Sequence, residues 1–389
     1  MAVALVVTTA GLLPVYLTGA LSVQMRGALK FGDAGLGLAV AGFFAGAAIA
    51  SVGSGYLAAR RGAPRMMCDS LIVTGLALLL SGAVASSWIE VVVLLALAGA
   101  AFGAGQPATN LFLTNAGPRH RQGLAFGVKQ AAAPAATLVA GLSVPVVGIT
   151  IGWRWAFIGA GVCAFTGALL VRRRRTSLDQ AVSGSQPPGL RALVVLTSAT
   201  TLGSAAGSAL GAFVVAGAVQ IGFSAGLAGV VAGVGSALGI VARIGVGDQA
   251  DRRWKRLLWV VAMMLAGGAI GFGLLAFGQR WWFLVGIAIA FASGWGWAGL
   301  FNLAIIRAYP YSPAQATGIS QMGAYLGGML GPLAFGLAIT HTSYRVAWIC
   351  AATTAALAAA MMLIGHGLLS ADHPGPQRPT ADLTFRART

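Results

Sequence analysis

The chain has 389 residues, of which 58% are apolar and only 8% are charged. Soluble domains carry about 25% charged residues and need them on their surface, so this composition excludes a soluble globular enzyme. The 25 Lys and Arg and 8 Asp and Glu give a net charge of +17. The bases stand in short clusters between long uncharged runs, which argues against a nucleic-acid partner and for a lipid bilayer.

Apolar runs predict twelve membrane-spanning helices. Each run has about 20 residues, which matches the roughly 30 Å hydrocarbon core of a bilayer. The runs lack the alternation of barrel strands, so we predict an all-α integral membrane protein. The spans are predicted at residues 2–24, 35–58, 66–87, 90–115, 123–146, 154–171, 192–219, 225–246, 257–278, 282–307, 316–339 and 346–368. In span eleven, Gly323, Gly327 and Gly331 stand four residues apart, a spacing that favours close helix packing.

Basic loops predict the orientation and the domain division. Lys and Arg gather in alternate loops, for example at Arg60 and Arg61 and at residues 172–175, and basic loops stay in the cytoplasm. We therefore expect a multi-pass plasma (inner) membrane protein with both termini cytoplasmic, no removed signal peptide and a monomeric state. The predicted divisions are an N-terminal six-helix bundle at 1–171, a basic cytoplasmic linker at 172–191, a C-terminal six-helix bundle at 192–369 and a cytoplasmic tail at 370–389.

The two halves of the chain repeat each other with a shift of 191 or 192 residues. RWAFI at 154–158 opens span six, and RVAWI at 345–349 opens span twelve. Gly127 and Gln130 correspond to Gly318 and Gln321. Six spans per half keep both copies in the same orientation, which is the parallel repeat of one large class of secondary transporters.

A loop motif is also duplicated. GYLAARRGAPR at 55–65 follows span two, and GDQADRRWKR at 247–256 follows span eight. Both resemble the G-x-L-A-D-R-x-G-R-R loop of the major facilitator superfamily, and the resemblance covers all twelve spans. It implies two pseudo-symmetric six-helix bundles around a central cavity that opens alternately to either side. The residues that match the loop, and that we expect to gate the cavity, are Gly55, Arg60, Arg61, Gly247, Asp251 and Arg252.

The aspartate of this loop carries the implied gating role. In the family it pairs with nearby basic groups and a helix N-terminus, and so holds the cytoplasmic side closed. Asp251 with Arg252 fits that role in the second copy, whereas Ala59 stands at the matching position of the first copy. Only one of the two latches is therefore expected, and a plain solvated loop charge is the alternative interpretation of Asp251.

Polar residues inside the spans are candidates for a substrate cavity. An ionised side chain at the midplane costs about 2.5–3.5 kcal/mol on insertion scales, so it marks function. Lys129 lies well inside span five, whereas Asp69 and Arg243 lie within a few residues of predicted span ends. Lys129 either attracts an anionic group of the substrate or is satisfied by snorkelling or internal pairing. Asn110 and Gln130 reach a similar depth, and Asn302 and Gln321 match them in the second half.

Aromatic residues add four weaker candidates. Trp295 and Trp297 stand among glycines in span ten, where they form either a stacking wall for a solute or a helix-packing contact. Tyr16 in span one and Tyr325 in span eleven are candidate cavity hydroxyls.

These residues favour a transporter of a small-molecule substrate. Drug antiporters of the resembled family carry G-P-x-x-G-G in span five, but here it reads AAAPAA at 131–136. We therefore favour uptake or exchange of a small anionic metabolite, with multidrug efflux as the alternative. A proton is the candidate coupling ion, yet no carboxylate lies deep in a span. Facilitated diffusion, substrate antiport and coupling through Lys129, Asp69 or Asp33 stay open.

An enzyme is the alternative from another class. It rests on Ser224 in the segment GFSAG at 222–226, which lacks the strand-to-helix context of a nucleophile elbow. We expect no catalytic residue, no cofactor and no metal. The three cysteines have no paired spacing, and no G-x-x-x-x-G-K-[ST] motif occurs.

Overall fold

The structure is a computed structural model, and it describes residues 2–52, 54–116, 122–172, 190–252 and 256–372. Helices make up almost all of these ranges, which contain no strand, so the predicted all-α class is confirmed. Residues 173–189 of the predicted linker and 373–389 of the predicted tail lie outside the described residues.

The first half, residues 2–172, comprises α1 (Ala2–Ala20), α2 (Ser22–Leu29), α3 (Asp33–Ser51), α4 (Ser54–Arg61), α5 (Ala63–Ala83), α6 (Trp88–Ala116), α7 (Gln122–Gln130), α8 (Ala132–Ser143), the π-helix η2 (Val144–Gly152) and α9 (Trp153–Arg172). The second half, residues 190–372, comprises α10 (Leu190–Gln220), α11 (Ala225–Arg252), α12 (Leu257–Leu275), α13 (Arg280–Ile289), the π-helix η3 (Ala290–Gly294), α14 (Ala298–Ala308), α15 (Pro313–His341) and α16 (Tyr344–Asp372).

The described helices account for twelve crossings. Eleven segments are long and apolar enough to cross a membrane, and one of them, Gln122–Val171, has 50 residues. A helix of that length would extend about 75 Å, against a hydrocarbon core of roughly 30 Å. Gly152, between η2 and α9, has a φ of +104°, a value that glycine adopts easily and other residues do not. The chain therefore reverses at Gly152, and this segment crosses twice.

Several helices differ from the predicted spans, among them those of spans two and eight. Predicted span two, 35–58, is divided into α3 and α4. Predicted span eight ends at residue 246, whereas α11 continues to Arg252. Within these last turns Asp248 and Arg252, four residues apart, form an exposed ion pair of 3.1 Å, which adds a small stabilisation to the helix. The residues expected in a loop thus form the last turns of α11.

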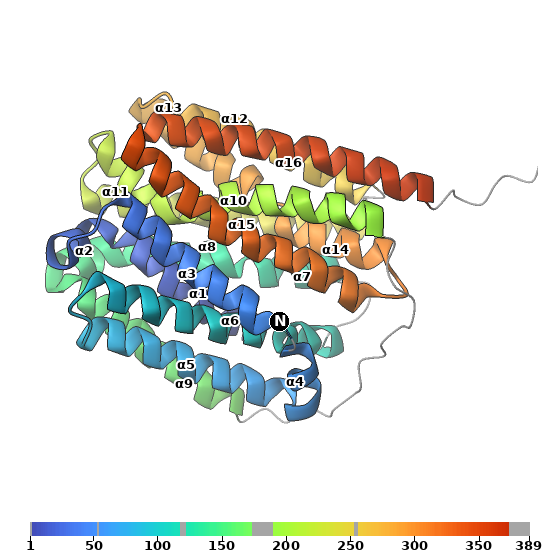
Figure 1. Cartoon of the computed structure of the whole chain (residues 1–389), viewed down its shortest axis with the longest axis horizontal. Coiled ribbons are helices and arrows are strands. Elements are labelled where there is room, and N and C mark those ends of the chain that lie inside the picture. The colour runs from blue at the N-terminus through green and yellow to red at the C-terminus, as the bar shows by residue number, and fades with distance from the viewer. Residues whose placement is uncertain (1, 53, 117–121, 173–189, 253–255, 373–389) are drawn as a thin grey trace, which may run out of the picture.

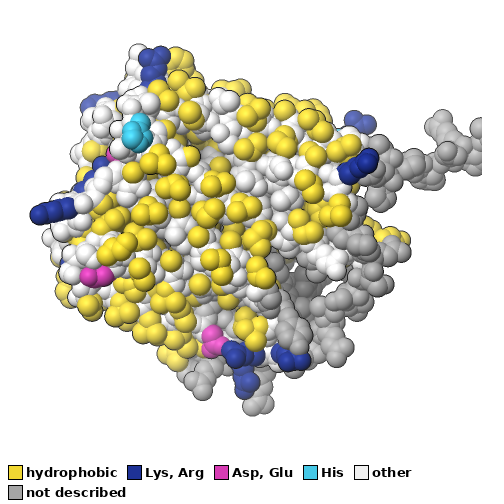
Figure 2. Space-filling model, in the orientation of Figure 1, with side chains coloured by type: hydrophobic (Ala, Val, Ile, Leu, Met, Phe, Trp, Pro, Cys, Tyr) yellow, Lys and Arg dark blue, Asp and Glu magenta, His cyan; other side chains and the backbone are white. Residues whose placement is uncertain are grey.

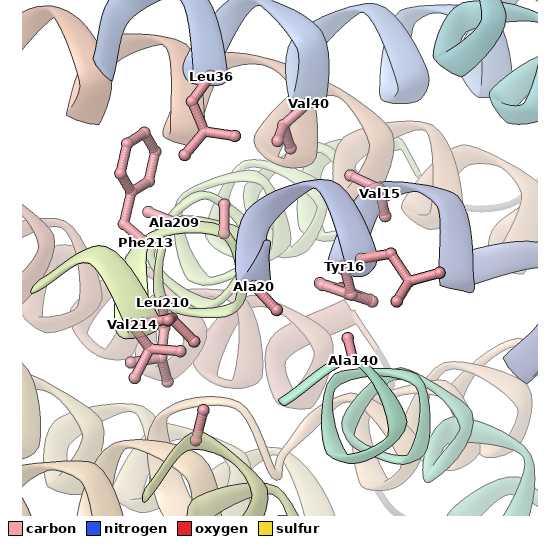
Figure 3. Packing of buried hydrophobic residues seen from close by; sticks show 14 of the residues in the cluster. Val15, Tyr16, Ala20, Leu36, Val40, Ala140, Ala209, Leu210, Phe213 and Val214 are labelled. Atoms are coloured by element: carbon pink, nitrogen blue, oxygen red, sulfur yellow. The ribbon is translucent and has the colours of Figure 1, made fainter. Parts of the chain in front are cut away.

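The two halves lie side by side, with the blue-to-green helices of the first half mostly below the yellow-green-to-red helices of the second (Figure 1). Several helix pairs join them: α3 packs against α15, α11 against α7 and α8, α1 against α10, and α14 against α7. Figure 3 shows Tyr16 and Ala20 of α1 next to Leu210 of α10 and Ala140 of α8. The buried core is therefore continuous between the halves.

The surface is that of a protein in lipid. Apolar side chains cover the middle of the face seen in Figure 2, and charged side chains lie toward its ends and lower edge. Large apolar residues stay exposed along the helices, including Ile49 and Val241, at 76% and 69% of their full exposure. Such exposure is stable in acyl chains, because lipid tails are as apolar as the side chains.

Small residues bring α15 close to α10, as the glycine spacing predicts. A Cβ atom at Gly323 would lie 2.7 Å from the carbonyl oxygen of Thr197. Added Cβ atoms at Gly327 and Gly331 would overlap the backbone of Thr201 and Ala205. All three glycines of the motif thus face the same neighbouring helix, and close backbone approach holds the pair together.

We expect Gly331→Ala to lower the melting temperature of the purified protein. The added methyl group overlaps the backbone at Ala205, and overpacking of this kind costs about 1–3 kcal/mol. Gly318→Ala on the same helix is the matched control, because nothing lies within 4 Å of its added Cβ. An equal change in melting temperature for the two variants would contradict the proposed packing role of Gly331.

Candidate functional site

A cavity of about 110 Å³ lies between the two halves and defines the central cavity. Its walls come from both halves, so any movement of one half against the other changes its shape. The lining residues are Leu12, Tyr16, Phe44, Phe102, Gln130 and Ala133 from the first half, and Thr200, Ser204, Ser208, Arg243, Trp295, Trp297, Ala298, Phe301, Asn302, Ser320, Gln321, Ala324 and Tyr325 from the second.

Arg243 is the charged residue of this lining. Its side chain lies on α11 and the residue is 3% exposed. The guanidinium group donates hydrogen bonds from Nη1 to the carbonyl oxygen of Gln130 and from Nη2 to that of Trp295. Its central carbon lies 5.4 Å from the centre of the Trp295 ring, within cation–π range. None of the ion pairs formed among the described residues includes Arg243, so its charge has no carboxylate partner there.

Both carbonyl groups that bind Arg243 are left free by a break in a helix. Gln130 would normally accept a hydrogen bond from residue 134, but Pro134 has no N–H group. Trp295 follows the π-helix η3 and precedes α14, in a short non-helical segment, and such irregularities often mark functional sites. Buried backbone groups need a hydrogen-bond partner in a membrane. Arg243 is that partner for the carbonyl group at one helix break in the first half and at one in the second.

Further aromatic rings pack around Trp295, the ring next to the guanidinium group. Tyr16 meets Trp295 edge to face, with 5.5 Å between ring centres, and Phe291 contacts the same indole at 5.6 Å. Trp297 donates its indole N–H to the carbonyl oxygen of Gly294 at 3.1 Å and packs against Phe301. Both tryptophans are buried and both line the cavity. The two interpretations of these tryptophans, a cavity wall and a helix-packing contact, are therefore compatible.

Lys129 and Asn110 lie elsewhere. Lys129 is 5% exposed and donates a hydrogen bond from Nζ to Oδ1 of Asn110, and neither residue lines the central cavity. Successive residues of an α-helix point about 100° apart, so Gln130 reaches the cavity while its neighbour Lys129 faces α6. The structure therefore pairs Lys129 with Asn110 inside the protein, which is one of the two interpretations of this residue.

The other candidates do line the cavity. Gln130 contributes from the first half, and Asn302 and Gln321 from the second. Tyr16, Tyr325, Trp295 and Trp297 also belong to the lining. The matched pair Asn110 and Asn302 therefore differs between the halves, because only Asn302 faces the cavity. Sequence analysis did not identify Arg243 as a site residue. Two signals were available: the charge of Arg243 next to the glycine-rich sequence of span eight, and Pro134 within span five.

Asp251 joins the two halves at one end of the bundle. Its Oδ1 and Oδ2 atoms accept hydrogen bonds from the backbone N–H groups of Gly123 and Leu124, each at 2.9 Å. These are the free N–H groups at the start of α7, where the helix dipole also favours a negative charge. Arg307 of α14 lies 3.5 Å from Oδ1. Gly247 permits this contact, because an added Cβ atom would lie 2.6 Å from the carbonyl oxygen of Gly123.

The other gating candidates play no part in this contact. Arg252 pairs with Asp248 rather than with Asp251, so the expected partnership of Asp251 and Arg252 is replaced by Asp251 and Arg307. In the first copy, Gly55, Arg60 and Arg61 belong to α4, and the side chains of Arg60 and Arg61 are exposed. Residue 59, at the position that matches Asp251, is an alanine and has no carboxylate for such a contact.

A second contact between the halves lies at the opposite end of the bundle. Asp33, the first residue of α3, forms an ion pair with Arg26 of α2. Its Oδ1 atom also accepts a hydrogen bond of 3.0 Å from the hydroxyl group of Tyr344, the first residue of α16. The central cavity therefore lies between two carboxylates, each of which contacts the other half.

These features define a class of protein: a membrane-embedded helical bundle in two halves, with a cavity lined by polar and aromatic side chains between them and a contact at each end. Such a protein is a multi-pass transporter. The family model of the Major Facilitator Superfamily matches residues 3–312, and the chain belongs to that superfamily.

Solved structures agree with this assignment. The crystal structure of a mutant of the nucleoside transporter NupG covers 93% of this chain and 99% of its own at 14% identity, with a TM-score of 0.70. The crystal structure of a D-xylose-proton symporter covers 92% of this chain and 96% of its own at 16% identity, with a TM-score of 0.75. At these identities the likeness is one of fold. No curated protein matches the sequence.

The chain is a transporter and not an enzyme. Ser224, the basis of the enzyme alternative, stands just before α11, and its Oγ accepts a hydrogen bond of 3.3 Å from the backbone N–H of Leu227. It caps a helix, which is a common structural role for serine.

Proposed function

We propose that this protein carries a small organic anion across the plasma membrane by alternating access, in uptake or exchange. The observation that carries the proposal is Arg243, a buried guanidinium group in the cavity wall without a carboxylate partner among the described residues. A buried charge is costly until an opposite charge meets it, and a guanidinium group binds a carboxylate with two parallel hydrogen bonds. The proposed anion site is thus Arg243, and not Lys129, for which the sequence left an anion contact and internal pairing open.

The transport cycle follows from the two end contacts. The bundles at 1–171 and 192–369 would rock about the cavity, and the contacts of Asp251 and Asp33 would break in turn. The basic loops support an orientation with Asp251, the linker at 172–191 and both termini in the cytoplasm. Asp33 and Tyr344 then face the outside. We expect the protein to act as a monomer, with the two halves of one chain forming the two walls of the site.

Coupling by exchange fits the cavity better than proton coupling. No Asp or Glu belongs to the lining that the described residues form, so no carboxylate is positioned to exchange its proton as the substrate binds. We expect anion uptake into liposomes to rise when the same anion is loaded inside. A proton gradient without internal anion should give no such rise.

A ligand panel tests the proposal. Thermal stabilisation of the purified protein is measured with small carboxylates and with a lipophilic cation such as tetraphenylphosphonium. We expect carboxylates to stabilise it and the cation to have no effect, because Arg243 repels a positive charge. Lys129→Gln should keep the response to carboxylates, since Lys129 contacts Asn110 outside the cavity. Binding of the cation alone would contradict the proposal and favour multidrug efflux.

A further inference from the structure

We infer that the substrate is a monocarboxylate built on a single planar ring. The inference rests on the proposed function, because it assumes that an anion binds Arg243, and it names the chemical class of that anion. Charge, size and the aromatic wall each restrict the choice.

Charge selects one carboxylate. Arg243 gives the described lining one positive charge, and no acidic residue lies in it. One carboxylate neutralises the site. A dicarboxylate would bring a second, unmatched charge into the cavity, and an amino acid would bring an ammonium group with no anionic partner. Unmatched buried charges are strongly unfavourable, so both classes should be rejected.

Size favours a single ring. The cavity of about 110 Å³ is smaller than the engineered cavity of about 150 Å³ that holds benzene. Drug-sized ligands occupy pockets of roughly 300–1,000 Å³. A compact single-ring acid needs only a slight widening of the cavity, whereas a fused or multi-ring acid needs the two halves to move further apart.

The aromatic lining of the cavity favours a substrate with a flat, apolar ring. Tyr16, Phe44 and Phe102 line the cavity from the first half, and Trp295, Trp297, Phe301 and Tyr325 line it from the second. The Trp295 ring lies beside the guanidinium group, at 5.4 Å, and meets Tyr16 at 5.5 Å. A carboxylate held by Arg243 therefore places the atoms attached to it against this aromatic pair. Aromatic rings gain from edge-to-face and offset contacts that saturated rings cannot make.

Tyr325 offers a place for a ring substituent. Its side chain is 2% exposed, and its hydroxyl group lies beside the Gln321 side chain. That hydroxyl group makes no well-formed hydrogen bond with the described residues. A buried hydroxyl group without a partner is unfavourable, so a hydroxyl group on the substrate ring would satisfy it. The preferred ligand is thus a hydroxyl-bearing aromatic acid.

The test compares ligands of similar size on the purified full-length chain. Calorimetry measures the binding of benzoate, 4-hydroxybenzoate, cyclohexanecarboxylate, succinate, phenylalanine and benzylammonium. We expect 4-hydroxybenzoate to bind most tightly and benzoate next. Cyclohexanecarboxylate, which has the same charge but a puckered ring, should bind about threefold or more weakly than benzoate. Succinate, phenylalanine and benzylammonium should show no binding.

Tyr325→Phe isolates the hydroxyl contact, because it removes one oxygen atom and leaves the ring in place. It should remove the advantage of 4-hydroxybenzoate over benzoate and leave the affinity for benzoate unchanged. An equal loss for both ligands would contradict the assigned contact. Trp282→Leu, on the exposed part of α13, is the control and should change neither affinity.

The outcomes separate this inference from the proposed function. If cyclohexanecarboxylate or succinate binds as tightly as benzoate and needs Arg243, the ring inference is wrong while the anion proposal stands. If no carboxylate binds in an Arg243-dependent way, the anion proposal itself fails. Benzoate binding that survives Arg243→Gln unchanged would also overturn both.

Discussion

Arg243→Gln is expected to abolish carboxylate transport while the protein still folds. The change removes the one positive charge that the described residues place on the cavity. A hydrogen-bonded ion pair in a desolvated site contributes about 3 kcal/mol or more, which corresponds to roughly a hundredfold or greater loss of affinity. Glutamine can still donate to a backbone carbonyl oxygen, so part of the contact with Gln130 and Trp295 can re-form. The measurement is counterflow of labelled benzoate in liposomes, with binding measured separately.

Arg154 provides a matched control. It also donates to two backbone carbonyl oxygens, those of Gly82 at 3.1 Å and Ala85 at 2.8 Å. Its guanidinium group also lies over an indole ring, that of Trp153 at 4.7 Å, but it lies outside the cavity lining. Arg154→Gln should lower stability and keep affinity. If both variants lose transport in proportion to their melting temperatures, Arg243 has a structural role only.

Arg243→Lys separates charge from geometry. A lysine keeps the positive charge but lacks the planar fork that binds two oxygens side by side. We expect this variant to bind carboxylates more tightly than Arg243→Gln does and more weakly than the native protein. Full activity in the lysine variant would show that charge alone suffices.

Asp251→Ala is expected to open the bundle at the end that bears α7. The substitution removes the acceptor of two backbone hydrogen bonds and the partner of Arg307. Hydrogen bonds to a charged group contribute about 1.5–3 kcal/mol, which shifts a two-state population roughly tenfold to a hundredfold. The substrate-free protein should therefore spend more time open on this side, and transport should slow because the opposite state is reached less often.

Cysteine labelling measures this shift. Ser204 lines the cavity, so Ser204→Cys reports access when the exposed Cys163 and Cys350 are replaced by serine. In Asp251→Ala, labelling by a membrane-impermeant maleimide should rise from the cytoplasmic face and fall from the outer face. Asp248→Asn is the control, since Asp248 pairs with the exposed Arg252 at the helix end and joins no helices of different halves. The same labelling in both variants would refute the latch.

Much of the architecture could be predicted from sequence, because it depends on length and hydropathy. The apolar runs determine the crossings, and the repeat places Gln130 and Gln321 at one level of the bundle. The spacing of Gly323, Gly327 and Gly331 correctly predicts close packing. These features are local or periodic, so they do not depend on knowing which helix faces which.

The choice of the cavity cation could not be predicted in the same way. Hydropathy ends span eight at residue 246 and so places Arg243 near the membrane surface. The helix actually continues to Arg252, which lies nine residues and about 14 Å beyond Arg243. Arg243 therefore lies deeper in the bundle than the predicted span indicates. Lys129 has the right depth but the wrong direction, because its side chain points to Asn110. Depth along a helix can be counted from sequence, whereas rotation around its axis depends on the neighbouring helices.

The use of backbone carbonyls as partners for Arg243 has an electrical consequence. Carbonyl groups are dipoles without net charge, so the guanidinium group keeps its full positive charge when the cavity is empty. With a monovalent anion bound, the same site is neutral. The membrane voltage then acts on the return of the empty carrier and leaves the loaded carrier almost unaffected. The sign of the voltage, rather than substrate affinity, would set how fast an unloaded molecule becomes ready for its next cycle.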